Sequence, residues 1–445
     1  MHCKISTTWS RLRLAVLSST LLLVVSSAFA FPIRMGLSPD NNLNLLLSVL
    51  NSARQELIIN IYQFESPEIA AAVIDRINAG VNVELLVEAE PFGQMSAQGK
   101  ETLTIISRAM RAKGNPRNHL FVMKKPASEN ARRRFRWNHA KYIIADQHLS
   151  LISSENFSRN GHPISGQVGN RGWDITMNDA KVAADLRAIF DADCDRKFGD
   201  VVELSGKEPA LEIPLRSPNP SRARKVAAIP IGRGEAKAAE LILSPRSLDG
   251  IVQLIRSARR NLEIEEMSLP AKWRSPHIAE NPIVTELIRA AQRGVEVRVL
   301  LNDDKVWSQP DPSPIRIGRT ETPLSTAPKK GNEATVELLR TVATSERLPL
   351  SAKIIDVQAA EITYIHNKGI LVDGQLAFVG SINGTQNSVV NNREVAILLE
   401  SPDAAEYFGA AFDFDWGRSN MEKREINSLF LVVGKIPATV DQFLE

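Results

Sequence analysis

Two short segments carry the residues whose types and spacing best suit catalysis. In each, a lysine follows a histidine by two positions and an aspartate follows it by seven. The two sets are His139, Lys141 and Asp146, and His366, Lys368 and Asp373. The chain has seven histidines, and none of the other five shows this spacing. Each residue type makes up about a twentieth of an average protein, so chance would rarely give two matches.

Histidine and lysine together suit the transfer of a phosphoryl group. Cleavage of a phosphodiester needs a nucleophile, positive charge near the non-bridging oxygens and a proton for the leaving alkoxide. A neutral imidazole can attack phosphorus, while a protonated one donates to the leaving group and later deprotonates water or an alcohol. Lys141 and Lys368 supply the charge. Because the two sets are nearly symmetric, they do not by themselves decide which histidine attacks.

Small polar residues follow both segments at equal distances. Ser154 and Asn156 lie 15 and 17 residues after the first histidine, as do Ser381 and Asn383 after the second. At the end of a strand, hydroxyl and amide groups can donate hydrogen bonds to an anion. We therefore expect these four residues to bind or orient the substrate phosphate.

These motifs resemble the signature of the phospholipase D superfamily, a duplicated H-x-K-x(4)-D followed by G-S-x-N. The second copy matches fully, whereas the first has Ser153 in place of the glycine. The resemblance covers most of the chain and implies that the two sets meet at the interface of two lobes, around a pseudo-two-fold axis. It implies a reaction without metal or other cofactor, with all six motif residues catalytic. It also implies that His139 is the nucleophile and His366 the acid and base.

The two copies differ at a later acidic position. Glu394 follows an Asn-Arg pair and matches a family glutamate that orients an active-site histidine. In the first copy the Asn-Arg pair is followed by Gly172, so this carboxylate is missing. Asp174 lies two residues further on, on the same face of a strand, and we expect it to replace the glutamate. The alternative is that Asp174 is a solvated residue on an edge strand.

A weak internal repeat indicates how the two sets are positioned. Residues 52–59 resemble 257–264, and residues 79–86 resemble 293–300. In each copy, amphipathic helices alternate with short apolar segments typical of buried strands. This order predicts an α/β fold with two similar lobes, each a central mixed β-sheet flanked by helices. Each motif then lies on a strand, with its histidine and lysine on one face.

Composition places the boundaries of the lobes. Residues 214–237 are rich in Pro, Arg, Gly and Ala without periodicity, and we interpret them as a linker. The first lobe is then residues 31–213 and the second is residues 238–445. A second irregular stretch, residues 308–331, is interpreted as an inserted surface loop, either without a role or forming a lid over the site.

Residues 1–30 have the pattern of a secretory signal peptide, with basic residues before an apolar run that ends in Ala-Phe-Ala. We expect export, with an uncleaved membrane anchor as the alternative. Cleavage removes Cys3 and leaves Cys194 alone, so no intramolecular disulfide is expected. The composition, 43% hydrophobic and 24% charged, excludes disordered, collagen-like and polytopic membrane proteins. The net charge of +3 equals the three basic residues of this segment.

The substrate is less well specified. A run of arginines and aromatic residues, 132–137, precedes the first motif and suits an anionic lipid headgroup or a nucleic-acid backbone, unless it is a solvated basic loop. Export and a neutral mature chain favour lipid. We expect an exported enzyme that hydrolyses phospholipid headgroup phosphodiester bonds and can transfer the headgroup to an alcohol. The alternatives are an exported nuclease of the same superfamily and a non-catalytic lipid- or nucleic-acid-binding module. No obligate protein partner is inferred.

Overall fold

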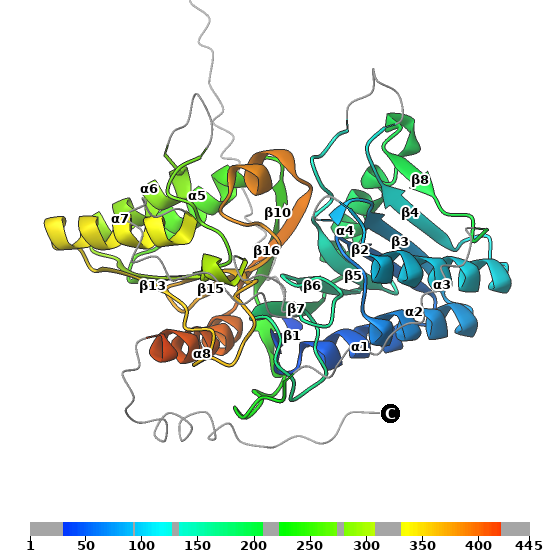
Figure 1. Cartoon of the computed structure of the whole chain (residues 1–445), viewed down its shortest axis with the longest axis horizontal. Helices are drawn as coiled ribbons and strands as arrows, with labels where there is room; N and C mark the ends of the chain where they lie inside the picture. Colours follow the sequence, from blue (N-terminus) through cyan, green and yellow to red (C-terminus); the bar gives the residue numbers. More distant parts are fainter. Residues whose placement is uncertain are drawn as a thin grey trace, which may run out of the picture.

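The computed structural model describes residues 30–91, 94–126, 133–207, 222–273, 280–307 and 331–419. Two mixed sheets with helices on their faces form two similar lobes (Figure 1). The fold class predicted from the sequence is thereby confirmed. The signal peptide and almost all of the predicted inserted loop fall outside the described residues. In the described ranges, no helix is both long and apolar enough to cross a membrane.

The first sheet has the order β8-β4-β3-β2-β5-β6-β7-β1-β9, in which β2, β3 and β4 are parallel and the other pairs antiparallel. Its strands are β1 (Phe31–Ser38), β2 (Glu56–Ile61), β3 (Asn82–Glu88), β4 (His119–Met123), β5 (Lys141–Ala145), β6 (Leu149–Ser153), β7 (Gly172–Asn178), β8 (Val201–Glu203) and β9 (Gly232–Ala236). Its helices are α1 (Asn42–Ser52), α2 (Pro67–Ala79), α3 (Ala97–Lys113) and α4 (Ala180–Asp193).

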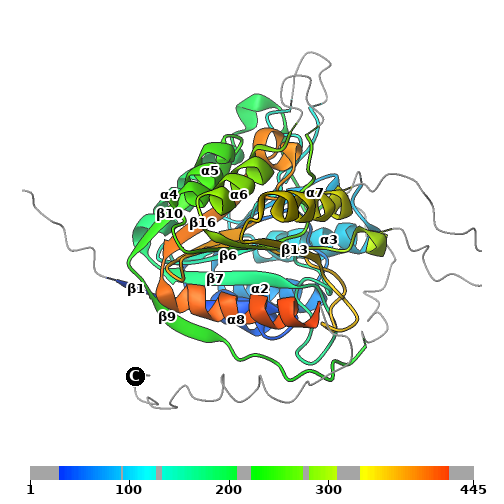
Figure 2. The same cartoon turned by 90° about the vertical axis from the view of Figure 1, so that its left-hand side faces the viewer.

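The second sheet has the order β10-β16-β15-β14-β11-β12-β13, with β11, β12 and β13 parallel. Its strands are β10 (Ala238–Ser244), β11 (Asn261–Glu266), β12 (Glu296–Leu301), β13 (Leu350–Ile354), β14 (Lys368–Val372), β15 (Leu376–Gly380) and β16 (Glu394–Glu400). Helices α5 (Ser247–Ser257), α6 (Pro282–Gln292) and α7 (Gly331–Glu346) lie on one side, and α8 (Pro402–Arg418) lies on the other (Figure 2).

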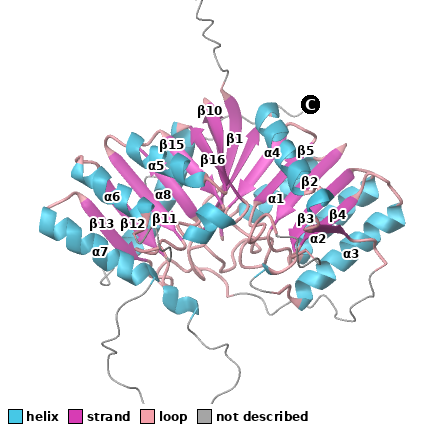
Figure 3. Cartoon of the chain, turned by 90° about the horizontal axis from the view of Figure 1, so that it is seen from above, coloured by secondary structure: helices cyan, strands magenta, loops and turns pink. Residues whose placement is uncertain are grey.

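The two sheets repeat one another along the chain. Strands β2, β5, β6, β7 and β1 follow one another in the same order as β11, β14, β15, β16 and β10, and the halves lie side by side in Figure 3. The hydrophobic core is continuous between them, because Trp173 of β7 stacks on Phe408 of α8 with ring centroids 4.5 Å apart. A core shared in this way holds the lobes in a fixed relation.

Local sequence signals account for the helices that follow β2 and β11. Ser66 accepts a hydrogen bond from the Ile69 amide at the start of α2, and Asn281 accepts one from the Ile283 amide at the start of α6. Each cap is followed by proline at the first helical position, where a missing N–H costs nothing. Gly80 ends α2 with φ of 90°, which an L side chain rarely adopts.

The predicted linker, residues 214–237, is not irregular at its end. Strand β9 falls within it and pairs antiparallel with β1, so it is the last strand of the first sheet. Strand β10 begins directly afterwards at the edge of the second sheet. The chain therefore passes from one sheet to the other within two residues, and residues 214–221 of the predicted linker lie outside the described ranges.

Candidate active site

Both motif histidines lie just before a central strand, and both motif lysines begin that strand. Lys141 starts β5 and Lys368 starts β14, and each lysine Nζ donates a hydrogen bond to the carbonyl of its own histidine. Lys141, Lys368 and His366 are buried, whereas the His139 side chain is 12% exposed. Since residues two apart in an extended chain share a face, the H-x-K spacing brings imidazole and ammonium groups together.

Backbone hydrogen bonds fix each histidine to the opposite lobe. The His139 amide donates to the Arg393 carbonyl at 2.8 Å, and the His366 amide donates to the Arg171 carbonyl at 2.8 Å. The return bonds run from the Arg393 amide to the Trp137 carbonyl, and from the Arg171 amide to the Tyr364 carbonyl. Each arginine directly precedes β16 or β7. Backbone hydrogen bonds of the two motif segments themselves therefore join the two lobes at the site.

The arginine side chains secure the same interface. Arg171 is fully buried and bonds Asp415 of α8 at 2.6 Å and Asp40 at 2.9 Å. Arg393 bonds Asp193, the last residue of α4, at 2.9 Å. Each arginine thus reaches the last helix of the other lobe, so the ion pairs follow the same pseudo-symmetry as the backbone bonds.

Glu394, the first residue of β16, holds the histidine of the other lobe. Its Oε2 lies 2.6 Å from His139 Nδ1, while its Oε1 accepts from Ser388 Oγ and from Asn392 Nδ2 at 2.9 Å. Glu394 belongs to the second copy of the repeat, yet it crosses the lobe interface to the histidine of the first copy. With Nδ1–H donated to the carboxylate, Nε2 is the nitrogen that carries the lone pair.

Asp174 does not replace the missing glutamate, and this prediction was wrong. Among the described residues, its oxygens pair with His162 Nε2 at 3.0 Å and with Ser153 Oγ at 2.6 Å, and with neither motif histidine. The alternative of a solvated residue is also wrong, because Asp174 is completely buried. It lies on β7 and fixes the loop that carries His162.

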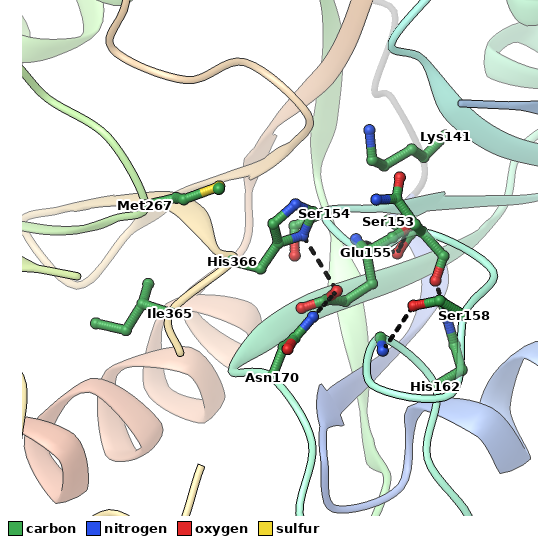
Figure 4. A network of polar contacts seen from close by, with 12 residues as sticks. Lys141, Ser153, Ser154, Glu155, Ser158, His162, Asn170, Met267, Ile365 and His366 are labelled. Carbon is green, nitrogen blue, oxygen red and sulfur yellow. Dashed lines mark hydrogen bonds and ion pairs between the residues drawn. The ribbon is translucent and has the colours of Figure 1, made fainter. Parts of the chain in front are cut away.

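A carboxylate that the sequence reasoning missed lies beside the second histidine. Oε2 of Glu155 is 3.1 Å from His366 Nδ1 and accepts from Asn170 Nδ2 at 3.0 Å (Figure 4). Glu155 occupies the variable position of the S-x-N motif, where the second copy has the apolar Ile382. An acidic residue at a position that is apolar in the other copy was the available signal.

The predicted phosphate-binding residues lie at the ends of β6 and β15. Ser154 Oγ accepts from the Trp173 amide, and Ser381 Oγ bonds the amide and carbonyl of Val395, so both hydroxyls join neighbouring strands. In the described part of the chain, the buried Oδ1 atoms of Asn156 and Asn383 have no hydrogen-bond partner. These unpaired atoms are acceptors, so they can receive a hydrogen-bond donor but not a phosphate oxygen.

Comparison with known proteins agrees with this duplicated geometry. A family model described as "Cardiolipin synthase, PLD-like domain" matches residues 46–194 and 251–416, which together exceed half of the chain. The chain belongs to the PLD-like family. The phospholipase D resemblance drawn from the motifs is thereby confirmed. No curated protein matches this PLD-like chain.

Two solved structures are similar to most or to part of this PLD-like chain. Phosphatidylserine synthase of Haemophilus influenzae Rd KW20 has a TM-score of 0.57 and 13% identity, covering 87% of this chain and 88% of its own. The phospholipase D family member Nuc from Salmonella typhimurium is 20% identical, with a TM-score of 0.30, covering 39% of this chain and 98% of its own. At these identities, the likeness to the synthase shows the fold and leaves the substrate open.

The motif aspartates of this PLD-like chain lie at the far ends of their strands from the histidines. Asp146 accepts from the backbone amides of residues 54–56, and Asp373 accepts from those of residues 259–261. Both carboxylates thus close the turn that leads into β2 or β11. The sequence motifs predicted Asp146 and Asp373 to be catalytic. The structure corrects this, because both carboxylates bind backbone amides of a turn and so stabilise the scaffold.

The arginine run before the first motif is largely neutralised. Arg133 pairs with the buried Glu88, and Arg134 pairs with the buried Asp200. Arg136 is exposed and lies over the Trp137 ring at 4.7 Å. The described part of the run is therefore no broad phosphate-binding surface. It offers only the Arg136 guanidinium and the Trp137 indole beside His139. Arg132 lies outside the described residues.

Burial and mutual repulsion dominate the electrostatics of the PLD-like site. Burial, reinforced by Lys141, lowers the pKa of His139 to about 4 against the opposing effect of Glu394. Burial, followed by Lys368, Lys141 and His139, holds the pKa of His366 well below its usual value. Burial also lowers the pKa of Lys368 to about 8. A bound phosphate anion would relieve this repulsion and favour the protonated forms.

The described residues contain no group of three or more His, Cys, Asp or Glu side chains arranged to hold a metal ion. The two motif lysines lie in one electrostatic cluster with the two motif histidines. Lys368 acts on His139, and Lys141 acts on His366, so each lysine influences the histidine of the other lobe.

Proposed function

We propose that the chain is a phospholipase D-type phosphodiesterase that hydrolyses the headgroup phosphodiester bond of phospholipids through a phosphohistidine. The observation that carries the proposal is the His139–Glu394 pair across the lobe interface, electrostatically coupled to a second His-Lys pair. A neutral imidazole with Nδ1 held and Nε2 available is a nucleophile at neutral pH. Two buried lysines are suited to stabilise the charge of the pentacoordinate phosphorus.

The residues divide the reaction into two balanced steps. Nε2 of His139 attacks phosphorus, the bond to the headgroup oxygen breaks, and His366 gives its proton to that oxygen. Water then attacks the phosphohistidine, His366 takes up the water proton, and the P–N bond breaks to free His139. An alcohol in place of water would transfer the phosphatidyl group instead. Neutral His366 must therefore acquire a proton when the anionic substrate binds.

Lipid is favoured over nucleic acid by the rim of the site. Arg136 and Trp137 lie just before His139, and the amide of Arg136 donates to the carbonyl of Asn391. Beside Asn391, Val390 is 46% exposed. A cation, an indole and an aliphatic group together suit the boundary between headgroups and acyl chains. The matching family model and the similar synthase are also, by name, those of phospholipid enzymes.

Turnover of purified chain in EDTA on phosphatidylcholine or cardiolipin vesicles, and on single- and double-stranded DNA, tests the proposal. Release of headgroup from vesicles by the wild type, and none by His139→Asn, is the expected result. Cleavage of DNA without cleavage of lipid would establish the nuclease alternative. No turnover of any substrate by folded wild type, with lipid or DNA binding retained, would establish the binding module.

We also propose that residues 1–30 direct export, on the strength of their basic and apolar pattern. Fractionation of cells that express the full chain, or the chain lacking these residues, tests this. The full chain should be found outside the cytoplasm and shortened, whereas the truncated chain should stay inside. A full-length product that remains with the membrane would indicate the anchor.

A further inference from the structure

We propose that Glu155 is the positioning carboxylate of His366, reaching from the end of β6 the place that a glutamate at Gly172 would otherwise serve. The inference rests on the proposed function, because it assigns a role to the second histidine in that reaction. It concerns the variable position of the S-x-N motif, which is occupied by Ile382 in the second copy.

The first argument is spatial. Gly172 begins β7 as Glu394 begins β16, so the two positions are equivalent in the repeat. A Cβ built on Gly172 would lie 2.4 Å from Glu155 Oε1 and 2.5 Å from its Cγ. The Glu155 side chain thus fills the space that a residue at position 172 would enter. Glycine is required there because the carboxylate comes from the neighbouring strand.

The second argument is the correspondence of partners. Glu394 is held by Asn392 at 2.9 Å and lies 2.6 Å from Nδ1 of His139 in the other lobe. Glu155 is held by Asn170 at 3.0 Å and lies 3.1 Å from Nδ1 of the other lobe's histidine. Asn170 and Asn392 are equivalent in the two copies. The same amide therefore supports a carboxylate for the opposite histidine in both halves.

In the second copy the carboxylate and the uncharged residue occupy the opposite positions. Where Glu394 supplies the carboxylate, the S-x-N position is Ile382, which is 2% exposed and belongs to the core of the second lobe. The pairs are therefore Glu155 with Gly172, and Ile382 with Glu394. Each copy therefore has one carboxylate at one of these two positions and an apolar residue or glycine at the other. This complementarity is what a relocated function requires, and Asp174 has no part in it.

The surroundings suit a pair that holds one proton. Burial raises the pKa of Glu155 well above its usual value and lowers that of His366, so a proton can lie on either partner. In the described structure, Nδ1 of His366 and Oε1 of Glu155 have no aligned hydrogen-bond partner. A small rotation would align Oε2 with Nδ1 as the imidazole becomes charged. Nε2–H would then go to the leaving oxygen while Glu155 supplies Nδ1–H.

Three variants test the role: Glu155→Gln, Glu155→Ile, and Glu155→Ile combined with Gly172→Glu. Loss of an orienting carboxylate should lower kcat on phospholipid by about 10- to 100-fold with KM nearly unchanged. Bis(4-nitrophenyl) phosphate should be affected less, because nitrophenolate leaves without a proton. The combined variant gives the first copy the residues of the second, and we expect it to recover most of kcat. A merely structural glutamate would not be replaced from another strand.

The pH profile gives a second readout with a definite sign. The acid must be protonated, so activity falls as pH rises through the pKa of the His366–Glu155 pair. In Glu155→Gln the carboxylate is gone, so the pKa of the acid is the lowered pKa of His366 alone. The alkaline limb of the pH–activity profile should therefore move to lower pH in this variant. Equal losses on both diesters, an unmoved limb and no recovery in the combined variant would overturn the proposal.

A readout without turnover separates this inference from the proposed function. Histidine ¹⁵N NMR of the wild type should show His366 Nδ1 hydrogen-bonded and protonated at higher pH than in Glu155→Gln. An identical titration in both proteins would refute the positioning role even if phospholipid is cleaved. A shifted titration with no phospholipid turnover would sustain the pair and defeat the lipid assignment. If Glu155→Ile fails to fold, the Glu155→Gln variant and this titration still test the positioning role of Glu155.

Discussion

Glu394→Gln removes the charge from the carboxylate that holds the proposed nucleophile and changes little else. The wild-type contact between His139 Nδ1 and Glu394 Oε2 is 2.6 Å long and buried. Burial would raise the pKa of Glu394, but His139, Lys141 and Asn392 outweigh it and the pKa is lowered, so the group is a carboxylate at neutral pH. The variant therefore exchanges a charge-assisted hydrogen bond for a neutral one.

The size of the effect follows from that exchange. A buried hydrogen bond to a charged group contributes about 1.5–3 kcal/mol, against about 1 kcal/mol for a neutral pair. A difference of about 0.5–2 kcal/mol in the attacking step corresponds to roughly a 2- to 30-fold loss of kcat. An amide that presents its NH2 to Nδ1 would also place the proton on Nε2 and block attack. We therefore expect a loss at or above the upper end of this range.

Acid-quenched single-turnover kinetics measure the attack directly as the rate of phosphoenzyme formation. Glu361→Gln is the matched control, because Glu361 accepts backbone hydrogen bonds from Lys225 and Val226 and has no contact with His139 among the described residues. Phosphoenzyme should form slowly in Glu394→Gln and at the wild-type rate in the control. Equal rates in all three proteins would refute the orientation of His139 by Glu394.

Three further predictions address the scaffold and the membrane surface. Asp146→Asn and Asp373→Asn should each lower the free energy of unfolding by about 1 kcal/mol, measured in urea, with kcat of the folded enzyme unchanged; a large loss of kcat would return the aspartates to the catalytic groups. Arg171→Met should destabilise by about 3–5 kcal/mol, since the buried Asp415 loses its ion pair and the buried Asp40 keeps only Arg224, and an unchanged melting temperature would contradict its role in joining the lobes. Val390→Asp should reduce turnover on vesicles by roughly tenfold and leave a water-soluble diester unaffected, whereas Leu338→Asp, at a similarly exposed position on α7, should change neither; equal loss on both substrates would argue against a membrane contact at Val390.

The local features of the site were predictable because they depend on short spacing. An H-x-K pair in an extended segment must share a face, and the internal repeat had to produce two such pairs in similar sheets. Strands β5 and β14 begin at Lys141 and Lys368, as this interpretation requires. Alternating helices and strands likewise predicted the α/β fold, because periodicity reports which face of an element is buried.

The partners of the histidines were not predictable from spacing, because they come from the other lobe. Glu394 lies 255 positions from His139, and Glu155 reaches His366 only after both sheets have formed. The arginine run, residues 132–137, was interpreted as a phosphate-binding segment because its ion-pair partners are also distant in sequence. Its counter-charges, Glu88 and Asp200, are distant in sequence, and a charge count cannot show that they are buried beside Arg133 and Arg134.

The aspartates of the two motifs show a different limit. A fixed spacing of seven residues indicates a constraint without saying whether chemistry or folding imposes it. In this fold the constraint is the length of the strand, since Asp146 caps the turn at one end of β5 and His139 precedes the other. The proximity of motif residues in sequence therefore does not place them all in the active site.

The identity of the phosphorylated residue tests the central claim most directly. The chain is mixed with a ³²P-labelled phospholipid, quenched within one turnover, and digested so that the labelled peptide can be sequenced. We predict an acid-labile, alkali-stable phosphohistidine at His139, present in wild type, absent in His139→Asn, and able to accumulate in His366→Asn with a leaving group that needs no proton. Label at His366, or full turnover by His139→Asn, would contradict the account.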